Sequence, residues 1–299
     1  MVATLGVWAG ICAMQSLAAD PIATMTIADG QIRVIQGAHR YAGVAGMRIA
    51  PETIVETGER AFAQLESGIR TQLGPQTRLL ISSGKGTSLL QGAYLLSGWL
   101  KIDNSTNAPL KTGTATVEIT ALDGTLIAWA DRERTMLFIE SGTAQIVERG
   151  AAEALTTITL AANRNYQRQR GKPGVRGTGA GLLGAELPTS FHDALPDLVA
   201  RFASVQLPPQ PDAGFSYADV RDWLVLDANV RKRFARLWRS RVHDEDFRAG
   251  LIADLRWHPE WHDLLFPPPP PELVQRDARI IPVNAAATGS NAPRAEPAH

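Results

Sequence analysis

A glycine-punctuated series of short alternating segments between Ile27 and Tyr166 constrains the fold of this chain most strongly. Apolar and polar residues alternate in Gln31–Ile35, Ala61–Glu66 and Thr114–Thr120, which is the period-two pattern of half-buried strands. Glycines and Asn-Ser-Thr clusters interrupt these segments. Short strands at this spacing favour an antiparallel sandwich, barrel or roll over a parallel sheet covered by helices.

Three glycine-containing stretches in this region have the composition of hairpin turns. They are Glu66–Ile69, Leu122–Thr125 and Ser141-Gly142. Glycine supplies the positive φ that tight turns between strands require. We therefore predict a reversal of the chain at each of the three.

Residues 167–187 break the alternating pattern. Arg168–Gly181 is rich in glycine and in cationic residues, which is typical of a flexible linker. Gly177–Gly181 also has the glycine density of a phosphate-binding loop. However, the stretch lacks both the Gly-Lys-Ser/Thr ending and the frame of a strand followed by a long helix. The sequence favours the linker.

From residue 188 to residue 266 the period becomes helical, which predicts a separate helical domain. Ser190–Asp193 and Ser216–Asp219 each place a capping residue three positions before an acid. Val230, Phe234 and Trp238 then fall on one helix face. Residues 267–299 begin with five prolines, which cannot continue a helix, and form a predicted Pro-rich, disordered tail.

The N-terminal 19 residues resemble a secretory signal peptide. The apolar run Leu5–Leu17 is too short to span a membrane and ends in small residues. The alternatives are a buried N-terminal helix or a misassigned start. No other segment approaches transmembrane length. The only cysteine, Cys12, lies in this run, so cleavage would leave a chain without a thiol. We expect a periplasmic or secreted protein.

The region from residue 27 to residue 166 resembles the FecR domain, a family named after a periplasmic iron-dicitrate sensor. Gly30–Gly37 is similar to the opening strand and glycine turn of that family. Ile54–Thr77 contains a Leu-Gly-Pro-x-Ser-like signature, with Thr77 in place of the usual serine. Leu96–Leu100 is similar to the central glycine turn, and Met136–Glu148 to the closing pair of strands.

Two departures limit what this resemblance implies. Asn163 stands where a closing glycine is expected, and the sequence has no anti-sigma segment or spanning helix. A sigma-regulator role is therefore not carried over. The resemblance implies a β-module for sensing or adhesion, and the helical domain matches no family.

The composition and motifs exclude several kinds of chemistry. The formal net charge is zero, and with the export signal this disfavours nucleic acid as a partner. No nucleophile motif of the Gly-x-Ser-x-Gly type is present, so we expect no catalytic residues and no enzyme. His258 and His262 are four residues apart, but a zinc site needs three or four ligands. We predict no metal site and no cofactor.

Four residues are candidates for ligand binding. Trp99 and Trp129 have the rings to stack on sugars, although tryptophan in a strand is more often part of a core. Arg233 and Arg236 lie in a basic helix that suits an anionic partner, but a solvated helix face explains the same pattern.

The sequence as a whole predicts a mainly β protein with an α C-terminal domain. The expected architecture is a FecR-like antiparallel β-sandwich or roll followed by a small helical bundle. The expected function is a non-catalytic sensing or protein-interaction module with an envelope protein as partner. The alternative is an envelope protein that binds a polysaccharide or another anion.

Overall fold

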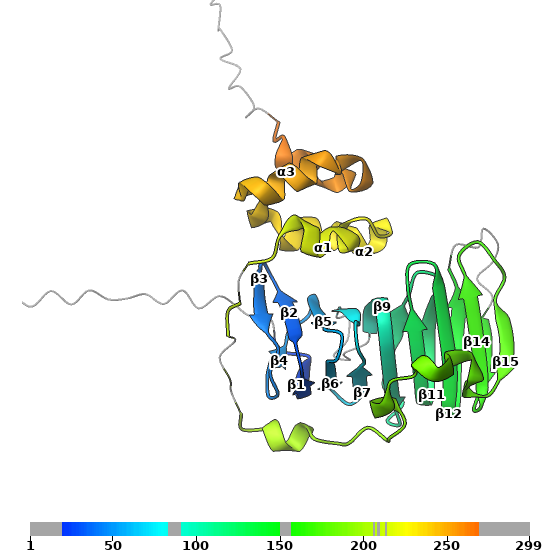
Figure 1. Cartoon of the computed structure of the whole chain (residues 1–299). Coiled ribbons are helices and arrows are strands. Elements are labelled where there is room, and N and C mark those ends of the chain that lie inside the picture. The colour runs from blue at the N-terminus through cyan, green and yellow to red at the C-terminus, as the bar shows by residue number, and fades with distance from the viewer. Residues whose placement is uncertain are drawn as a thin grey trace, which may run out of the picture.

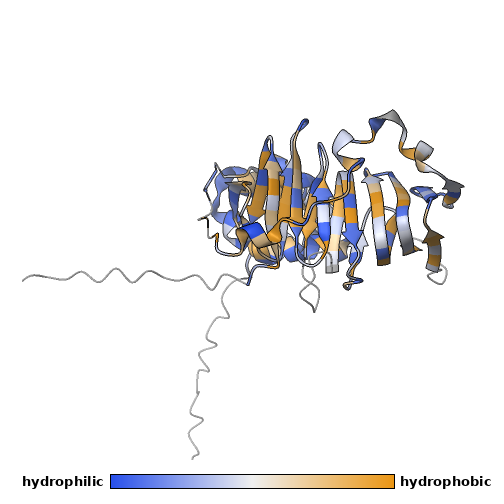
Figure 2. Cartoon of the chain, turned by 90° about the horizontal axis from the view of Figure 1, so that it is seen from below, coloured by the Kyte–Doolittle hydropathy of each residue, from blue (hydrophilic) through white to orange (hydrophobic). Residues whose placement is uncertain are grey.

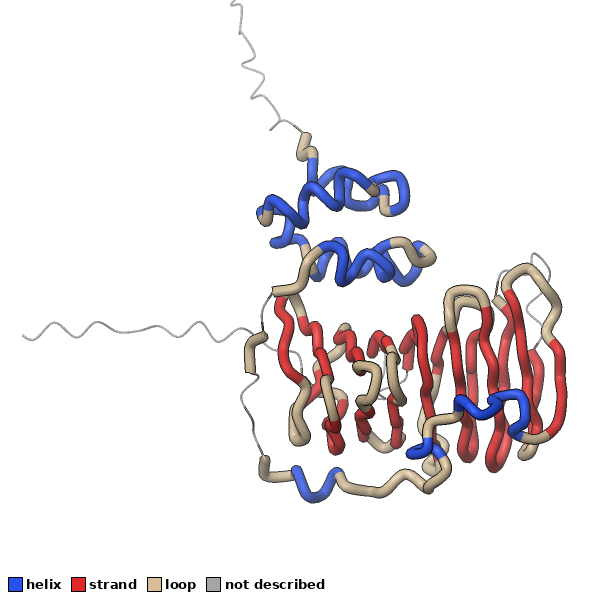
Figure 3. Tube along the Cα trace, viewed as in Figure 1, coloured by secondary structure: helices blue, strands red, loops and turns tan. Residues whose placement is uncertain are grey.

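A computed structural model describes residues 20–82, 91–149, 157–205, 207, 210–212 and 214–268. Figure 1 and Figure 3 show a large strand assembly and a small group of helices at the C-terminal end. The predicted mainly β fold with an α C-terminal part is confirmed. The predicted signal peptide lies outside the described residues, as does the tail beyond Pro268. In the described part of the chain, no helix has the length and apolarity needed to cross a membrane.

The strand pairings form two layers, here called sheet A and sheet B. Three long strands, β9 (Gln91–Asn104), β11 (Val117–Ala130) and β12 (Arg134–Glu148), belong to both. Their remaining strands run, from edge to edge, as follows. Sheet A has β4 (Arg48–Ile49), β1 (Ala23–Asp29), β6 (Phe62–Glu66), β7 (Arg70–Leu73), the long strands, β14 (Arg164–Gln169) and β15 (Val175–Thr178). Sheet B has β3 (His39–Ala42), β2 (Ile32–Gln36), β5 (Thr53–Thr57), β8 (Arg78–Ile81), β9, β10 (Lys111–Gly113), β11, β12 and β13 (Thr157–Ala161).

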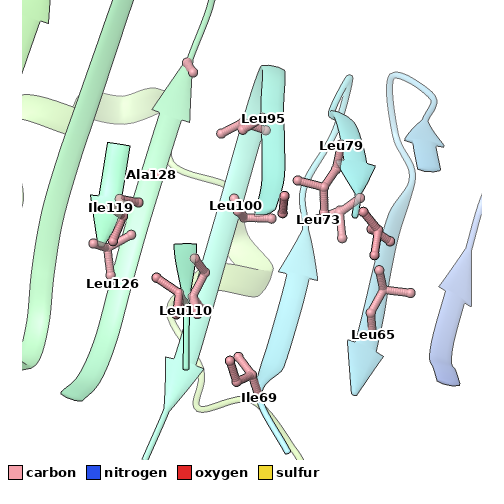
Figure 4. Close-up of a cluster of buried hydrophobic side chains, with 14 of the residues drawn as sticks. Leu65, Ile69, Leu73, Leu79, Leu95, Leu100, Leu110, Ile119, Leu126 and Ala128 are labelled. Carbon is pink, nitrogen blue, oxygen red and sulfur yellow. The ribbon is translucent and has the colours of Figure 1, made fainter. Parts of the chain in front are cut away.

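One hydrophobic core lies between the two sheets. Leu65, Leu73 and Leu100 of sheet A and Leu79 and Leu95 of sheet B are fully buried in the same cluster. Figure 4 shows these side chains converging from strands far apart in the sequence. The alternation of hydrophobic and hydrophilic residues along the strands is visible in Figure 2. Burial of this cluster is the main stabilising contribution to the roll.

The long strands change sheets at three glycines. In β9, residues up to Ser97 pair with β8, whereas residues from Gly98 pair with β11 in sheet A. Gly98, Gly124 and Gly142 have φ values of 94°, 118° and 73°. Gly124 and Gly142 face each other across β11 and β12, where both strands bend. These bends let one strand serve two layers.

Two of the three hairpin predictions are therefore wrong. Leu122–Thr125 and Ser141-Gly142 lie inside continuous strands, and their glycines accommodate a bend, not a reversal. The Leu96–Leu100 segment that resembles a glycine turn also lies inside a strand. The prediction at Glu66–Ile69 is confirmed, because β6 and β7 pair there around Gly68 with a φ of 79°.

Asn163 takes over the role of the missing closing glycine. It turns the chain from β13 to β14 with a φ of 60°. Asparagine is one of the few residues other than glycine that tolerates this left-handed conformation. The departure from the family pattern is therefore compatible with the same turn.

The helices form a cap over the outer side of sheet B. They are α1 (Tyr217–Leu224), α2 (Ala228–Leu237), α3 (Glu245–Ala253) and α4 (His262–Leu265). Ile35, Ile54, Leu80 and Tyr94 form a cross-strand row whose side chains are buried against the cap's aromatic core. Their strand neighbours point the other way into the inter-sheet core. Sheet B is thus apolar on both faces where the cap covers it.

The helical part begins later than predicted. The capping box at Ser216–Asp219 is confirmed at the start of α1. Ser190–Asp193 starts no α-helix, because only Thr189–Phe191 forms a 3-10 turn there. Pro188 and Pro196 flank this stretch, and each disfavours a helical conformation in the residue before it.

The predicted linker is also largely structured. Residues 167–169 complete β14, residues 175–178 form β15, and Ala180–Glu186 is 3-10 helical. The glycines in this stretch serve close packing, since a Cβ on Gly174 would lie 1.8 Å from the Tyr166 hydroxyl. Composition alone does not distinguish this use of glycine from chain flexibility.

Residues 180–203 cross the outer side of sheet A as a strap, seen along the lower side of the strands in Figure 1. The strap is held by buried charged side chains. The Lys101 ammonium is 3% exposed and donates to the Phe191 and Asp193 carbonyls at 2.7 and 3.0 Å. Glu66 accepts hydrogen bonds from the backbone of Leu198 and Val199.

A buried polar chain links the helices of the cap. The Tyr217 hydroxyl donates to Asp254 at 2.9 Å and lies 3.1 Å from Nε2 of His258. Arg221 completes the chain through an ion pair of 2.6 Å with Asp254. His258 is fully buried, and its Nδ1 has no hydrogen-bond partner among the described residues. Burial lowers the pKa of His258 below its usual range.

We predict that Gly124→Ala and Gly142→Ala each destabilise the fold by about 3 kcal/mol or more. An added Cβ would lie 2.3 Å from the Ser141 carbonyl oxygen at Gly124 and 1.7 Å from the Asp123 carbonyl oxygen at Gly142. Gly181→Ala is the matched control, because no atom lies within 4 Å of the position that its methyl group would take. Urea unfolding measures all three, and equal midpoints for the three variants would contradict the bend assignment.

We also predict that the cap loses stability as the pH falls below about 6.5. The unfolded chain protonates His258 near that pH, whereas the folded chain resists protonation because the ring is buried. The unfolded state therefore binds more protons, and the free energy of unfolding falls by at most about 1.4 kcal/mol per pH unit. His258→Gln should flatten this slope between pH 7 and 5 in urea titrations. His262→Gln, at an exposed ring, should leave it unchanged.

Candidate binding surfaces

The residues of the Leu-Gly-Pro-x-Ser-like signature meet the glycine bend of β9 in one corner of the roll. The Thr77 hydroxyl donates to the Trp99 carbonyl and accepts from the Trp99 amide, both at 2.9 Å. The Thr77 amide donates to the Thr57 hydroxyl, which donates to the Gly74 carbonyl. A Cβ on Gly98 would lie 2.4 Å from the Thr77 Cα. The signature thus holds a corner where the chain passes between sheets, and serine or threonine supplies the same hydroxyl.

An open cleft of about 740 Å³ lies beside this corner, here called the corner cleft. Its wall combines residues from three parts of the family-like sequence with helix α1, among them Gly30, Gly58, Gln76 and Asp219. The charged residues that line it balance, with three arginines against three carboxylates. They are Arg33, Arg60, Arg78, Glu56, Glu59 and Asp219.

Electrostatic contacts in the corner cleft tie the cap to sheet B. Arg78 pairs with Glu56 at 2.8 Å and with Asp222 of α1 at 2.7 Å. Burial alone would raise the pKa of Asp219, but hydrogen bonds from Ser216 and nearby arginines lower it. The lining of the cleft includes no histidine, cysteine or serine. This arrangement suits ionic recognition better than proton transfer.

The two candidate tryptophans lie under or beside the strap. Trp99 is 7% exposed and packs edge-on against Phe191 of the strap. Trp129 is partly buried next to Trp99, and the Arg134 guanidinium lies 5.3 Å from its ring centroid. Trp99 is therefore part of a small core. Trp129 presents a ring that an arginine already covers.

The two candidate arginines of α2 have different surroundings. Arg233 contacts Glu52 at 3.1 Å and Ser82 at 2.5 Å, so it joins the cap to sheet B. Arg236 is exposed and makes no hydrogen bond or ion pair within the described residues. The structure does not bring these two side chains into one site.

The histidines of the cap also lie apart. His258 is buried against Tyr217, whereas His262 is exposed beside Asp263. Among the described residues, no group of three or more His, Cys, Asp or Glu side chains is arranged to hold a metal ion.

Three of the four sheet edges are short or covered. The β3 edge carries a bridge between Tyr41 and Pro211, with flanking backbone hydrogen bonds to residues 210 and 212. The β4 edge has only two residues, Arg48 and Ile49. The β15 edge has four residues and includes an arginine. Short, charged or covered edges of this kind resist pairing with other chains.

The edge of sheet B at β13 has none of these protections. Thr157–Ala161 contains no charged residue and no proline, and its residues alternate between exposed and buried. It pairs with β12 on one side. In the described part of the chain, no strand pairs with its other side. The sequence analysis did not single out this strand, because its position at the edge depends on the pairing of distant segments.

Comparisons with known proteins give only distant similarities. No family model matches the chain, and no curated protein matches it. Two crystal structures of a proposed anti-sigma factor from Parabacteroides distasonis are similar to part of it, each at 12% identity. Their TM-scores are 0.36 and 0.38, over 44% and 45% of this chain, which spans 64% of the solved chains' length. The candidate surfaces therefore rest on this chain's own residues.

We predict that Thr77→Val destabilises the fold by about 2–4 kcal/mol, because two backbone groups of Trp99 lose their buried partner. Thr77→Ser keeps the hydroxyl and should cost about 1 kcal/mol for the lost methyl. Thr159→Val, on the exposed face of β13, is the control and should change stability by less than about 0.5 kcal/mol. Chemical denaturation gives the three values. Equal losses for the serine and valine variants would overturn the role of the hydroxyl.

Proposed function

We propose that this protein is a non-catalytic, extracytoplasmic protein-interaction and sensing module with a FecR-like β-domain. Its binding element is the free edge of β13, which takes an extended segment of an envelope protein by strand addition. The observation that carries the proposal is the unprotected edge of Thr157–Ala161 beside three edges that are short, charged or covered.

The chemistry of the edge defines the partner segment. The exposed backbone of an edge strand pairs with any extended chain, and alternate side chains supply specificity. The exposed side chains of β13 are Thr157, Thr159 and Ala161, which are small and uncharged. They favour a partner segment of β-branched and small residues with little charge.

Two further observations support the proposal. The quoted family motifs meet in a single corner of the roll, as expected for a FecR-like domain whose signature residues serve its architecture. The sequence of residues 1–19 supports export to the envelope. The lining of the corner cleft, with paired ions and no nucleophile, supports a binding protein over an enzyme.

The test compares partner capture by edge variants. Wild-type protein immobilised at its cap should retain an envelope protein that the double variant Thr157→Lys/Thr159→Lys loses by tenfold or more. Lysine on an edge strand blocks pairing without disturbing an exposed position. Thr178→Lys, on the exposed edge strand β15, is the control and should retain the partner.

A second readout places the contact. A photo-crosslinking residue at position 159 should label the captured protein, and the same residue at position 178 should not. Equal capture by all variants, or labelling from position 178 alone, would exclude β13 as the binding element.

A further inference from the structure

A second surface cavity, independent of the β13 edge, has the donors of an anion site. It lies in the seam between sheet B and α2, has a volume of about 240 Å³ and is here called the seam cavity. Three cations from separate segments line it. They are Lys111 of β10, Arg149 directly after β12, and Arg233 of α2. Their convergence is a product of the fold, since the three residues are far apart in the sequence.

The charge of its lining sets this cavity apart. The three cations face a single lining carboxylate, Glu118. In the corner cleft the lining charges cancel. In the cavity between β3 and the cap they also cancel, with Arg40 and Arg241 against Asp212 and Asp244. In the cavity beside the strap the carboxylates are in excess. Among these four cavities, only the seam cavity has a lining that attracts an anion.

Arg149 has most of its hydrogen-bonding capacity unused. Its guanidinium lies 5.5 Å from the Tyr94 ring centroid and donates to the Thr114 carbonyl at 3.0 Å. The nearest carboxylate, Asp227, is 3.7 Å away, which is beyond a normal hydrogen bond, and its side chain is 59% exposed. A guanidinium offers five N–H donors. Several donors of Arg149 therefore have no acceptor among the described residues.

Tyr94 adds a neutral donor. Its side chain is only 4% exposed and lines the seam cavity, yet its hydroxyl makes no hydrogen bond within the described residues. Buried hydroxyl groups are normally paired, so an unpaired one beside a cavity points to an absent acceptor. Burial raises the pKa of Tyr94 to about 12, so the hydroxyl keeps its proton at physiological pH.

The other two cations hold partners at the rim and retain donors. Lys111 pairs with Glu118 at 3.1 Å while its side chain stays 59% exposed. Arg233 pairs with Glu52 at 3.1 Å. Three like charges around a small cavity repel one another, and an anion between them removes that repulsion. Such an anion would also link the cap to sheet B, because Arg233 comes from one and Lys111 from the other.

We propose that the seam cavity binds a small oxyanion, either a free phosphate-like ion or the acidic group of a sugar. Lys111 and Arg149 supply the charge, and the Tyr94 hydroxyl supplies a neutral hydrogen bond. The bound anion stabilises the cap on sheet B by mass action. Oxyanions with several acceptor oxygens suit a ring of donors from arginine, lysine and tyrosine.

The test is calorimetric titration of the full chain with inorganic phosphate, at an ionic strength held constant with chloride. Saturable binding is expected, and Lys111→Gln and Tyr94→Phe should each weaken it at least fivefold. The first change is at an exposed side chain and the second keeps the ring, so both variants should fold. Arg236→Gln is the matched control on α2. It should leave the affinity within twofold, because Arg236 does not line the cavity.

Titrations with glucose 6-phosphate, glucuronate and neutral glucose identify the source of the anion. Tighter binding of either acidic sugar than of inorganic phosphate assigns the site to a glycan, and equal binding assigns it to the free ion. The proposal is overturned if phosphate binds no better than chloride. It is also overturned if Arg236→Gln weakens binding as much as Lys111→Gln, since the basic helix face would then be the site.

Discussion

The bends at Gly98, Gly124 and Gly142 are the constraint on which the rest of this fold depends. Because β9, β11 and β12 each serve both sheets, the two layers are joined along their centre by continuous backbone. The inter-sheet core forms between the two halves of the same strands. A side chain at Gly124 or Gly142 would collide with the neighbouring strand, so the layer change requires glycine there.

Joining the sheets in this way leaves two outer faces to be covered. Sheet B carries a cross-strand apolar row, which the cap buries. The outer face of sheet A carries Trp99 and Lys101, and the strap covers them through Phe191. A buried lysine is costly unless its donors are satisfied, and here two strap carbonyls and Glu140 satisfy them. Strap and cap are therefore integral to the stability of the roll.

With both faces covered, the surfaces left for binding are the edge of the roll and the seams between its parts. The β13 edge offers unpaired backbone of low charge, which suits another protein chain. The seam cavity offers cationic and neutral donors, which suit an anion. The two sites use different chemistry and lie on different elements, so a partner and a small ligand need not compete. Because Arg233 belongs to the cap and Lys111 to the sheet, anion binding would report on how firmly the cap is seated.

Local sequence patterns by themselves determined the strand-rich first part, the capping box at Ser216–Asp219 and the apolar face of α2, because these depend on neighbours within a few residues. The same patterns failed at Gly124 and Gly142, since a positive φ serves a hairpin turn and a strand bend equally well. They also failed at residues 167–187, where the glycines serve close packing. Only the tertiary structure decided that Trp99 is buried, that Arg233 and Arg236 lie apart, and that Tyr94, Lys111 and Arg149 meet. Those outcomes depend on strand pairing over long separations, and no local pattern encodes which distant segments become neighbours.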